Sequence, residues 1–135
     1  MTSKTIHVSG KRKRAIAKAT LRPGTGKIRV NKTLLENFSP LICRQKLVEA
    51  LTIAGPVAKK VNIDVSIVGG GIVSQVDAAK IAIARALLIH TKDKKLEKAF
   101  LSYDRQFLVA DVRRKEPAKP NRHGQARAKR QKSYR

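Results

Sequence analysis

Three consecutive glycines, Gly69 to Gly71, stand between a strand-like stretch and a helix-like stretch that opens at Ser74. A strand, a glycine turn and a helix N-terminus together form the phosphate site of many nucleotide-binding proteins. Here Ser74 occupies the third position of a GxGxxG pattern, and the acidic residue expected about 20 residues later is missing. The turn also lacks the GK[ST] ending of a P-loop. A tight strand-to-helix reversal explains the glycines, with an RNA phosphate on their amides as a minor alternative.

Other catalytic and metal-binding patterns are also missing from the sequence. His7, His90 and His123 are far apart, and the single cysteine, Cys43, is interpreted as a small core residue. The chain contains neither an HExxH nor a GxSxG motif. We therefore expect no enzymatic activity, no cofactor and no metal site.

Basic residues carry more information. The stretch RKRAIAKATLR, residues 12–22, alternates with a period of two, which predicts a strand with an apolar face of alanines and Leu21. Its opposite face would carry a row of cations about 6.6 Å apart, twice the rise of ~3.3 Å per residue. We expect this row to contain Arg12, Arg14, Lys18 and Arg22, and to be extended by Lys27 and Arg29 from the next strand. Such a row suits a phosphate backbone.

The charge balance supports a polyanionic partner. The 135 residues include 31 Lys and Arg against 9 Asp and Glu, a net charge of +22. Self-repulsion on this scale destabilises a compact state unless a polyanion neutralises it. No run of residues resembles a signal peptide or a membrane span, so we expect a cytoplasmic protein without a membrane partner. A nonspecific DNA-compacting protein remains an alternative to an RNA-binding one.

The pattern of apolar residues predicts one α+β domain over residues 1–112, with a sheet of about four strands and two to three helices packed on it. Strands are expected at residues 5–10, 12–22, 27–31 and 61–68. A first helix should open with Ser39 as N-cap and Pro40 at its first position, and bury Leu41, Leu47, Val48 and Leu51. A second should open at Ser74 with Asp77, and a short third should span residues 93–101. Residues 107–109 are expected to form an edge segment.

Residues 113–135 are expected to form a long extended basic tail. From Pro117 onward the chain holds two prolines, one glycine, seven Lys or Arg and no acidic residue. Such a segment cannot bury enough apolar surface to offset its ordering entropy. We predict that residues 117–135 are disordered in the free protein.

Four separated motifs resemble one family: SGKRKRAIAKATLRPGTGKIRVN, VSIVGGGIVSQVDAAKIAIARAL, YDRQFLVADVRRKEPAK and the terminal QKSYR. This family is the universal small-subunit ribosomal protein nine in its archaeal and eukaryotic form. The resemblance implies an α+β domain in the head of the small subunit that binds ribosomal RNA among neighbouring ribosomal proteins. It also implies a tail that threads through RNA and ends near the anticodon stem-loop of the P-site transfer RNA.

The candidate contacts follow from the basic pattern and the resemblance together. Those expected to bind ribosomal RNA are Lys11, Arg12, Lys13, Arg14, Lys18, Arg22, Lys27, Arg29, Arg113, Arg114, Lys115, Lys119, Arg122 and Arg127. Those expected to reach transfer RNA are Arg130, Lys132, Ser133, Tyr134 and Arg135. The cations would bind phosphates and Tyr134 would pack on a ribose or a base.

Overall fold

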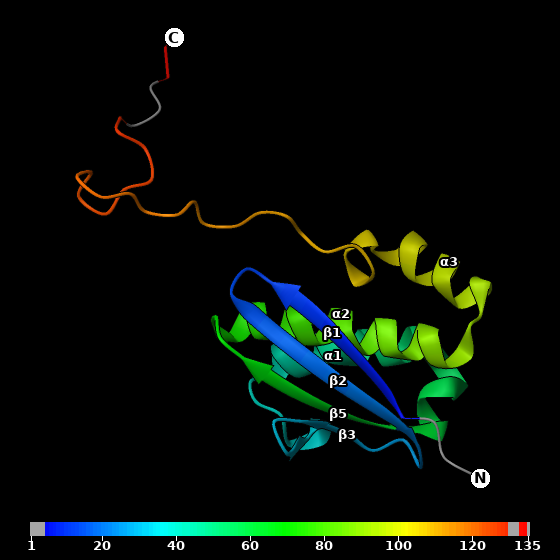
Figure 1. The fold of residues 1–135 in the computed structure, drawn as a ribbon. Helices are drawn as coiled ribbons and strands as arrows, with labels where there is room; N and C mark the ends of the chain where they lie inside the picture. The colour runs from blue at the N-terminus through cyan, green and yellow to red at the C-terminus, as the bar shows by residue number, and fades with distance from the viewer. Residues whose placement is uncertain (1–4, 130–132, 135) are drawn as a thin grey trace.

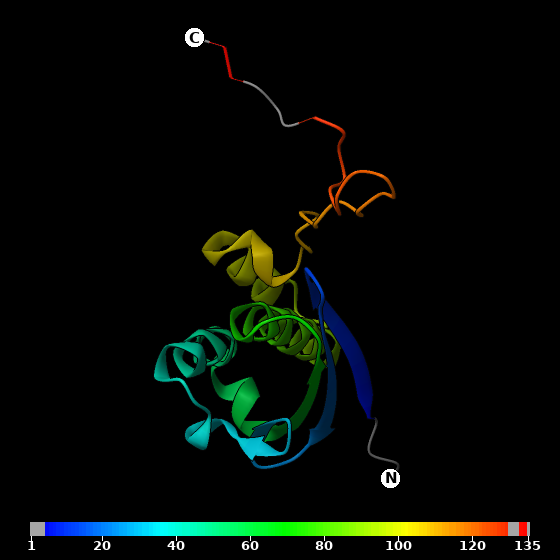
Figure 2. The same ribbon diagram turned by 90° about the vertical axis from the view of Figure 1, so that its left-hand side faces the viewer.

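The computed structural model describes residues 5–129, 133 and 134, and it confirms the expected α+β class. One twisted sheet carries the long helices on one of its faces and leaves the other face open (Figures 1 and 2). In chain order the elements are β1 (Ile6–Arg12), β2 (Ala15–Pro23), β3 (Ile28–Val30), β4 (Thr33–Leu34), α1 (Leu41–Ala54), β5 (Val61–Val68), α2 (Ile72–Thr91) and α3 (Lys94–Tyr103). Short 3-10 turns, η1 (Leu35–Asn37), η2 (Gly55–Lys60) and η3 (Arg105–Phe107), join them.

The sheet has five strands in the order β1-β2-β5-β3-β4. Neighbouring strands in the sheet run antiparallel, except for β3 and β5, which run parallel. The expected number was about four, and the additional strand, β4, contains only two residues. A strand of this length offers no alternation from which it could have been predicted.

The boundary between the first two strands differs from the prediction. The structure has a hairpin in which Arg12 pairs with Ala15 across a turn at Lys13 and Arg14, so one predicted strand over residues 12–22 is wrong at its start. Lys13 adopts a positive φ of 53°. Tight hairpin turns usually place glycine or asparagine at such a position, and a lysine gives no turn signal.

The core forms between the covered face of the sheet and the helices. Alternate residues of β2 and β5 are buried, as the period of two predicted, and α2 contributes Val76, Ala79, Ile83 and Leu87. Among the described residues no charged or polar side chain is buried. The alanines of β2 and α2 are small enough to let sheet and helix approach closely.

The first two helices do not begin where the sequence suggested. Helix α1 starts at Leu41 with Pro40 as its N-cap, and α2 starts at Ile72 with Gly71 as its N-cap, so neither Ser39 nor Ser74 caps a helix. Helix α1 buries Leu47 as predicted, together with Cys43, Ala50 and Ala54, whereas Leu41 and Val48, which were also expected to be buried, are exposed. The third helix agrees with the prediction, and the Asp93 side chain accepts a hydrogen bond from the Lys95 N–H at 2.8 Å.

Phe107 is the last fully buried side chain of the chain's described part. It lies in η3, where an edge segment was expected, and its ring centroid is 5.2 Å from that of Phe100. The Lys80 ammonium lies 4.3 Å from the centre of the Phe107 ring. Phe107 thereby fixes the point at which the chain leaves the domain.

Beyond η3, the described residues form neither helix nor strand, and the chain leaves the body in both views (Figures 1 and 2). Residues 116–127 form a loop, because Arg127 donates to Glu116 at 2.5 and 2.9 Å, and the Lys119 N–H donates to the Gln125 carbonyl at 3.1 Å. The disorder of residues 117–135 in the free protein and the domain boundary after residue 112 stay predictions.

Substitution of Gly10 on β1 tests how closely the sheet packs against α2. A Cβ on Gly10 would lie 2.3 Å from the Ala78 carbonyl oxygen and 2.8 Å from the Ala82 nitrogen, both backbone atoms of α2. Because neither atom can move without shifting the helix, Gly10→Ala should lower the free energy of unfolding by about 1–3 kcal/mol or more.

Urea unfolding followed by circular dichroism measures this change. The matched control is Gly71→Ala, since a Cβ there meets no atom within 4 Å and φ is negative. Alanine is a poorer N-cap than glycine but also lowers the entropy of the unfolded chain, and because these effects oppose each other the change should stay below about 1 kcal/mol. Equal midpoints for the two variants would contradict the packing described here.

Candidate nucleic-acid interface

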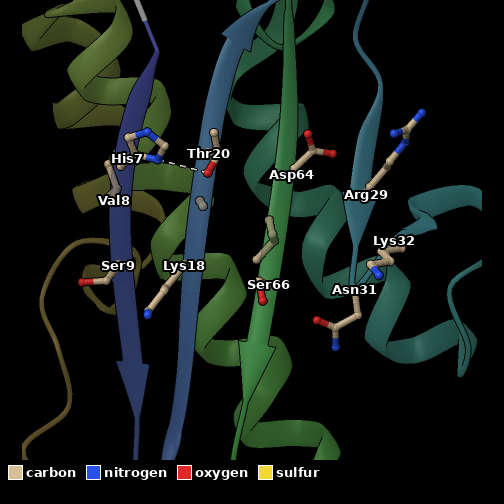
Figure 3. A pocket seen from close by; sticks show the side chains of 12 residues that line it. His7, Val8, Ser9, Lys18, Thr20, Arg29, Asn31, Lys32, Asp64 and Ser66 are labelled. Carbon is tan, nitrogen blue, oxygen red and sulfur yellow. Dashed lines mark hydrogen bonds between the residues drawn. The ribbon is translucent and has the colours of Figure 1, made fainter.

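The uncovered side of the sheet is a shallow polar hollow. Its volume is about 870 Å³, and its lining comes from β1, β2, β5, β3 and the turn after β3. Figure 3 shows its side chains arranged along neighbouring strands. We call this surface the open face and define it by His7, Ser9, Lys18, Thr20, Arg29, Asn31, Lys32, Asp64 and Ser66.

The open face mixes cations with neutral hydrogen-bonding groups. Lys18, Arg29 and Lys32 supply positive charge, and Asp64 is the one carboxylate of its lining. The His7 ring and the Thr20 hydroxyl lie 3.1 Å apart and form a hydrogen bond across two strands (Figure 3). A surface of this kind can bind phosphate oxygens through its cations and ribose hydroxyls through its polar groups.

The predicted row of cations is only partly present on this side of the sheet. Lys18 and Arg22 alternate with the buried residues of β2, and Arg29 lies between two buried residues of β3, so all three are on the outer side. Arg12 is wrong as a member of the row, because its side chain forms ion pairs with Asp111 and Asp77 instead. Arg14 lies in the hairpin turn, and the exposed Lys27 precedes β3. Because the hairpin turn divides the predicted strand, Arg12 belongs to β1 and lies opposite Ala15 of β2, so it does not continue the row formed by Lys18 and Arg22.

A second concave surface lies where the tail leaves the domain. It has a volume of about 880 Å³ and combines the β1–β2 turn, the glycine turn and the first tail residues. We call it the tail-base cleft; it is lined by Arg12, Lys13, Arg14, Gly70, Gly71, Ser74, Arg113, Arg114, Lys115, Glu116, Pro117 and Ala118. Six of these are basic and one is acidic. The cleft is therefore the more cationic of the two surfaces.

Contacts between residues about 100 positions apart assemble this cleft. Arg114 donates to the Lys13 carbonyl oxygen at 3.1 Å, and Arg12 donates to the Asp111 carboxylate. Arg113 also donates to Asp111, at 2.7 Å from Nη2 and 3.0 Å from Nε. This Arg113 guanidinium, together with the Arg113 N–H and the charge of Arg12, holds the pKa of the Asp111 carboxyl well below its ordinary value. The carboxylate stays ionised at neutral pH.

The glycine turn has the structural role that the sequence suggested. Gly69 and Gly70 have φ values of 78° and 68°, and a Cβ on Gly69 would lie 2.7 Å from the Arg14 carbonyl oxygen. The Gln75 side chain donates to the Gly69 carbonyl at 3.0 Å. Both the backbone conformation and the close approach of the hairpin thus require glycine.

The remaining candidates lie along the tail. Lys119 and Arg122 are exposed, while Arg127 pairs with Glu116 and lowers the pKa of that carboxyl. Tyr134 is 87% exposed. Ser133 is described and exposed, whereas Arg130, Lys132 and Arg135 lie outside the described residues.

Sequence reasoning missed Lys32 and Asn31, which follow β3 and line the open face. Both have positive φ values, 70° and 48°, so the chain turns there to reach the hollow. The Asn31 side chain also accepts a hydrogen bond from the Ile67 N–H at 2.9 Å, which holds this turn against β5. An Asn-Lys pair after a short alternating stretch was the available signal for such a turn.

Within the described range, His, Cys, Asp and Glu side chains nowhere gather in a group of three or more that could hold a metal ion. The same part of the chain contains no helix that is both long and apolar enough to cross a bilayer.

Comparison with known proteins adds an independent finding. The family model described as "Ribosomal protein S9/S16" matches residues 10–135. The small ribosomal subunit protein uS9 of Methanococcus maripaludis strain C7 is 47% identical over 133 residues, which cover 98% of this chain and 99% of the relative. The small ribosomal subunit protein uS9 of Methanococcus vannielii has the same identity and coverage.

Proposed function

Because this chain belongs to the ribosomal protein S9/S16 family, we propose that it is a structural constituent of the small ribosomal subunit in the cytoplasm. Its partners in that role are ribosomal RNA and other ribosomal proteins, and its contribution to translation is structural rather than enzymatic. The net charge of +22 agrees with a position inside a polyanion.

The proposed contact with ribosomal RNA uses the open face, the tail-base cleft and the tail. The observation that carries it is the cleft, where six basic residues from two distant segments surround one concavity. Such a concentration of cations is costly in the free protein, and a phosphate backbone relieves the repulsion. The open face adds hydroxyl and amide groups that suit ribose.

We propose further that the protein lies in the head of the small subunit and that the end of its tail contacts the P-site transfer RNA. This proposal rests on the resemblance of the terminal QKSYR to the family's C-terminus. An exposed Tyr134 at the end of a chain that leaves the body supports it. A tail that meets every transfer RNA in turn would position rather than read bases, through phosphate and ribose contacts.

The salt dependence of RNA binding tests the role of the tail-base cleft. In a triple variant, Lys13, Arg14 and Lys115 are each replaced by glutamine. The slope of the logarithm of its binding constant for a small-subunit ribosomal RNA fragment against the logarithm of salt concentration should become shallower by about 2 units, since each phosphate contact contributes ~0.7–0.9. Filter binding between about 50 and 200 mM salt gives the slope.

The matched control removes three exposed lysines of α3, Lys94, Lys95 and Lys98, and changes the net charge equally. Its slope should stay near that of the wild type. Equal losses in both triple variants would show that overall charge, and not the cleft, governs binding. Duplex DNA of the same length, bound as tightly as the RNA, would favour the DNA-compacting alternative.

The end of the tail is tested by deleting residues 133–135. Loss of one charge-assisted contact and one packing contact should weaken P-site transfer RNA binding by ~1–2 kcal/mol, roughly 5- to 30-fold in dissociation constant. Dissociation of transfer RNA from purified small subunits measures the effect. Gln131→Ala, at a tail residue outside the expected contacts, is the control and should behave like the wild type. Subunits that fail to assemble, or that release transfer RNA at the normal rate, would exclude the proposed role.

A further inference from the structure

We propose that Arg12 and Asp111 are positioning residues, which fasten the first residues of the tail to the β1–β2 hairpin and so hold the tail-base cleft in shape. This inference deepens the proposed function and rests on it, because its consequence is measured as RNA affinity. It differs from the prediction that Arg12 itself binds RNA: here the Arg12 guanidinium acts through the tail.

Four points between residues 107 and 114 tie the chain to the domain. The Phe107 ring is buried, and the next carbonyl, that of Leu108, accepts a hydrogen bond from Arg85 at 2.9 Å. The same Arg85 side chain donates to the Ser9 carbonyl on the β1 edge at 3.1 Å. Asp111 then meets Arg12, and Arg114 meets the Lys13 carbonyl. The chain is therefore held every one to three residues from 107 to 114.

Among these ties, the one between Asp111 and Arg12 is the most protected from solvent of the ion pairs described. The side chains of Arg12 and Asp111 are 16% and 11% exposed, whereas Arg127 and Glu116 of the tail loop are 66% and 51% exposed. Exposed ion pairs add little, but a pair that is shielded and shared by several hydrogen bonds holds its geometry more firmly. Asp77 of α2, 3.8 Å from the Arg12 Nε, fixes the other side of the guanidinium.

Asp111 also connects the two walls of the cleft. Its carboxylate receives Arg12 from the hairpin and Arg113 from the tail, and its Oδ1 accepts the Arg113 N–H at 2.8 Å. Without this carboxylate, Arg12 and Arg113 would be like charges brought together with nothing between them. Loss of Asp111 should therefore separate the walls and release the residues that follow.

Removing the Asp111 charge distinguishes the positioning role from simple charge attraction, because the two predict opposite changes in RNA affinity. Asp111→Asn adds one positive charge to the protein, so simple attraction to RNA would strengthen binding. The positioning role predicts weaker binding, because a released tail base loses conformational freedom each time it binds. We expect RNA affinity to fall by roughly threefold to tenfold, from one or more side chains ordered anew. Arg12→Gln removes one positive charge and should release the same residues.

Two matched controls separate position from charge. Glu97→Gln on the exposed side of α3 adds the same charge as Asp111→Asn, and should leave RNA affinity equal or slightly higher. Lys98→Gln on α3 removes the same charge as Arg12→Gln, and the exposed Lys98 lines neither the open face nor the tail-base cleft. Asp111→Glu keeps the carboxylate and should retain most of the affinity.

The first measurement needs no RNA. Heteronuclear ¹⁵N relaxation of the full-length protein should show residues 111–115 as ordered as the sheet in the wild type, in both control variants and in Asp111→Glu. The same residues should become mobile in Asp111→Asn and Arg12→Gln, while the amide signals of β2 and α2 keep their positions and report an intact fold. Unchanged order at residues 111–115 in both variants would overturn the proposal.

The second measurement is the affinity of the same proteins for the ribosomal RNA fragment at one fixed salt concentration. Weaker binding by both Asp111→Asn and Arg12→Gln supports the positioning role. Tighter binding by Asp111→Asn, equal to that of Glu97→Gln, overturns it and leaves charge alone in control. A wild-type protein that fails to bind the fragment would contradict the proposed function instead, while the relaxation result would still decide whether the anchor exists.

Discussion

An excess of positive charge is the constraint on which the rest of this structure depends. The chain has 31 basic residues and only 9 acidic ones. Its fold therefore depends on a core without charges and on ion pairs that place the few carboxylates between cations. In the described part of the chain, the core is apolar, and five of the nine carboxylates form ion pairs. Asp77, Asp104 and Asp111 join the helices, the hairpin and the tail base, where repulsion between neighbouring cations would otherwise separate them.

The same constraint explains why the two cationic surfaces lie at the margins of the fold. Alanines on β2 and α2 bring the sheet and the helix close together on one face of the sheet. The other face carries mostly polar and charged side chains, with Ile16 and Val68 also exposed there. The tail-base cleft forms beside this sheet because the hairpin turn and the tail are tied together there. Both surfaces are thus consequences of packing, and in the proposed function RNA provides the countercharge that the chain itself lacks.

Local patterns in the sequence were sufficient for much of the fold. The period of two located β5 and most of β2, and Asp93 marked the start of α3. The hairpin turn at Lys13 was missed because a lysine with positive φ carries no turn signal. In helix α1, Leu47 is buried as predicted, but Ala50 is buried and Leu41 and Val48 are exposed, contrary to the prediction. The cleft was beyond prediction, since Arg12 and Asp111 are 99 positions apart and no spacing rule connects them.

Site-specific crosslinking in assembled small subunits tests the central claim, that the open face and the tail-base cleft contact ribosomal RNA. A photoreactive group would replace Ser66 on the open face, Lys13 in the cleft or, for comparison, Gln45 on α1, away from both surfaces. Crosslinks to ribosomal RNA from residues 66 and 13, and far fewer from residue 45, are the predicted result. RNA crosslinks mainly from residue 45, with the other two facing solvent or protein, would contradict this account.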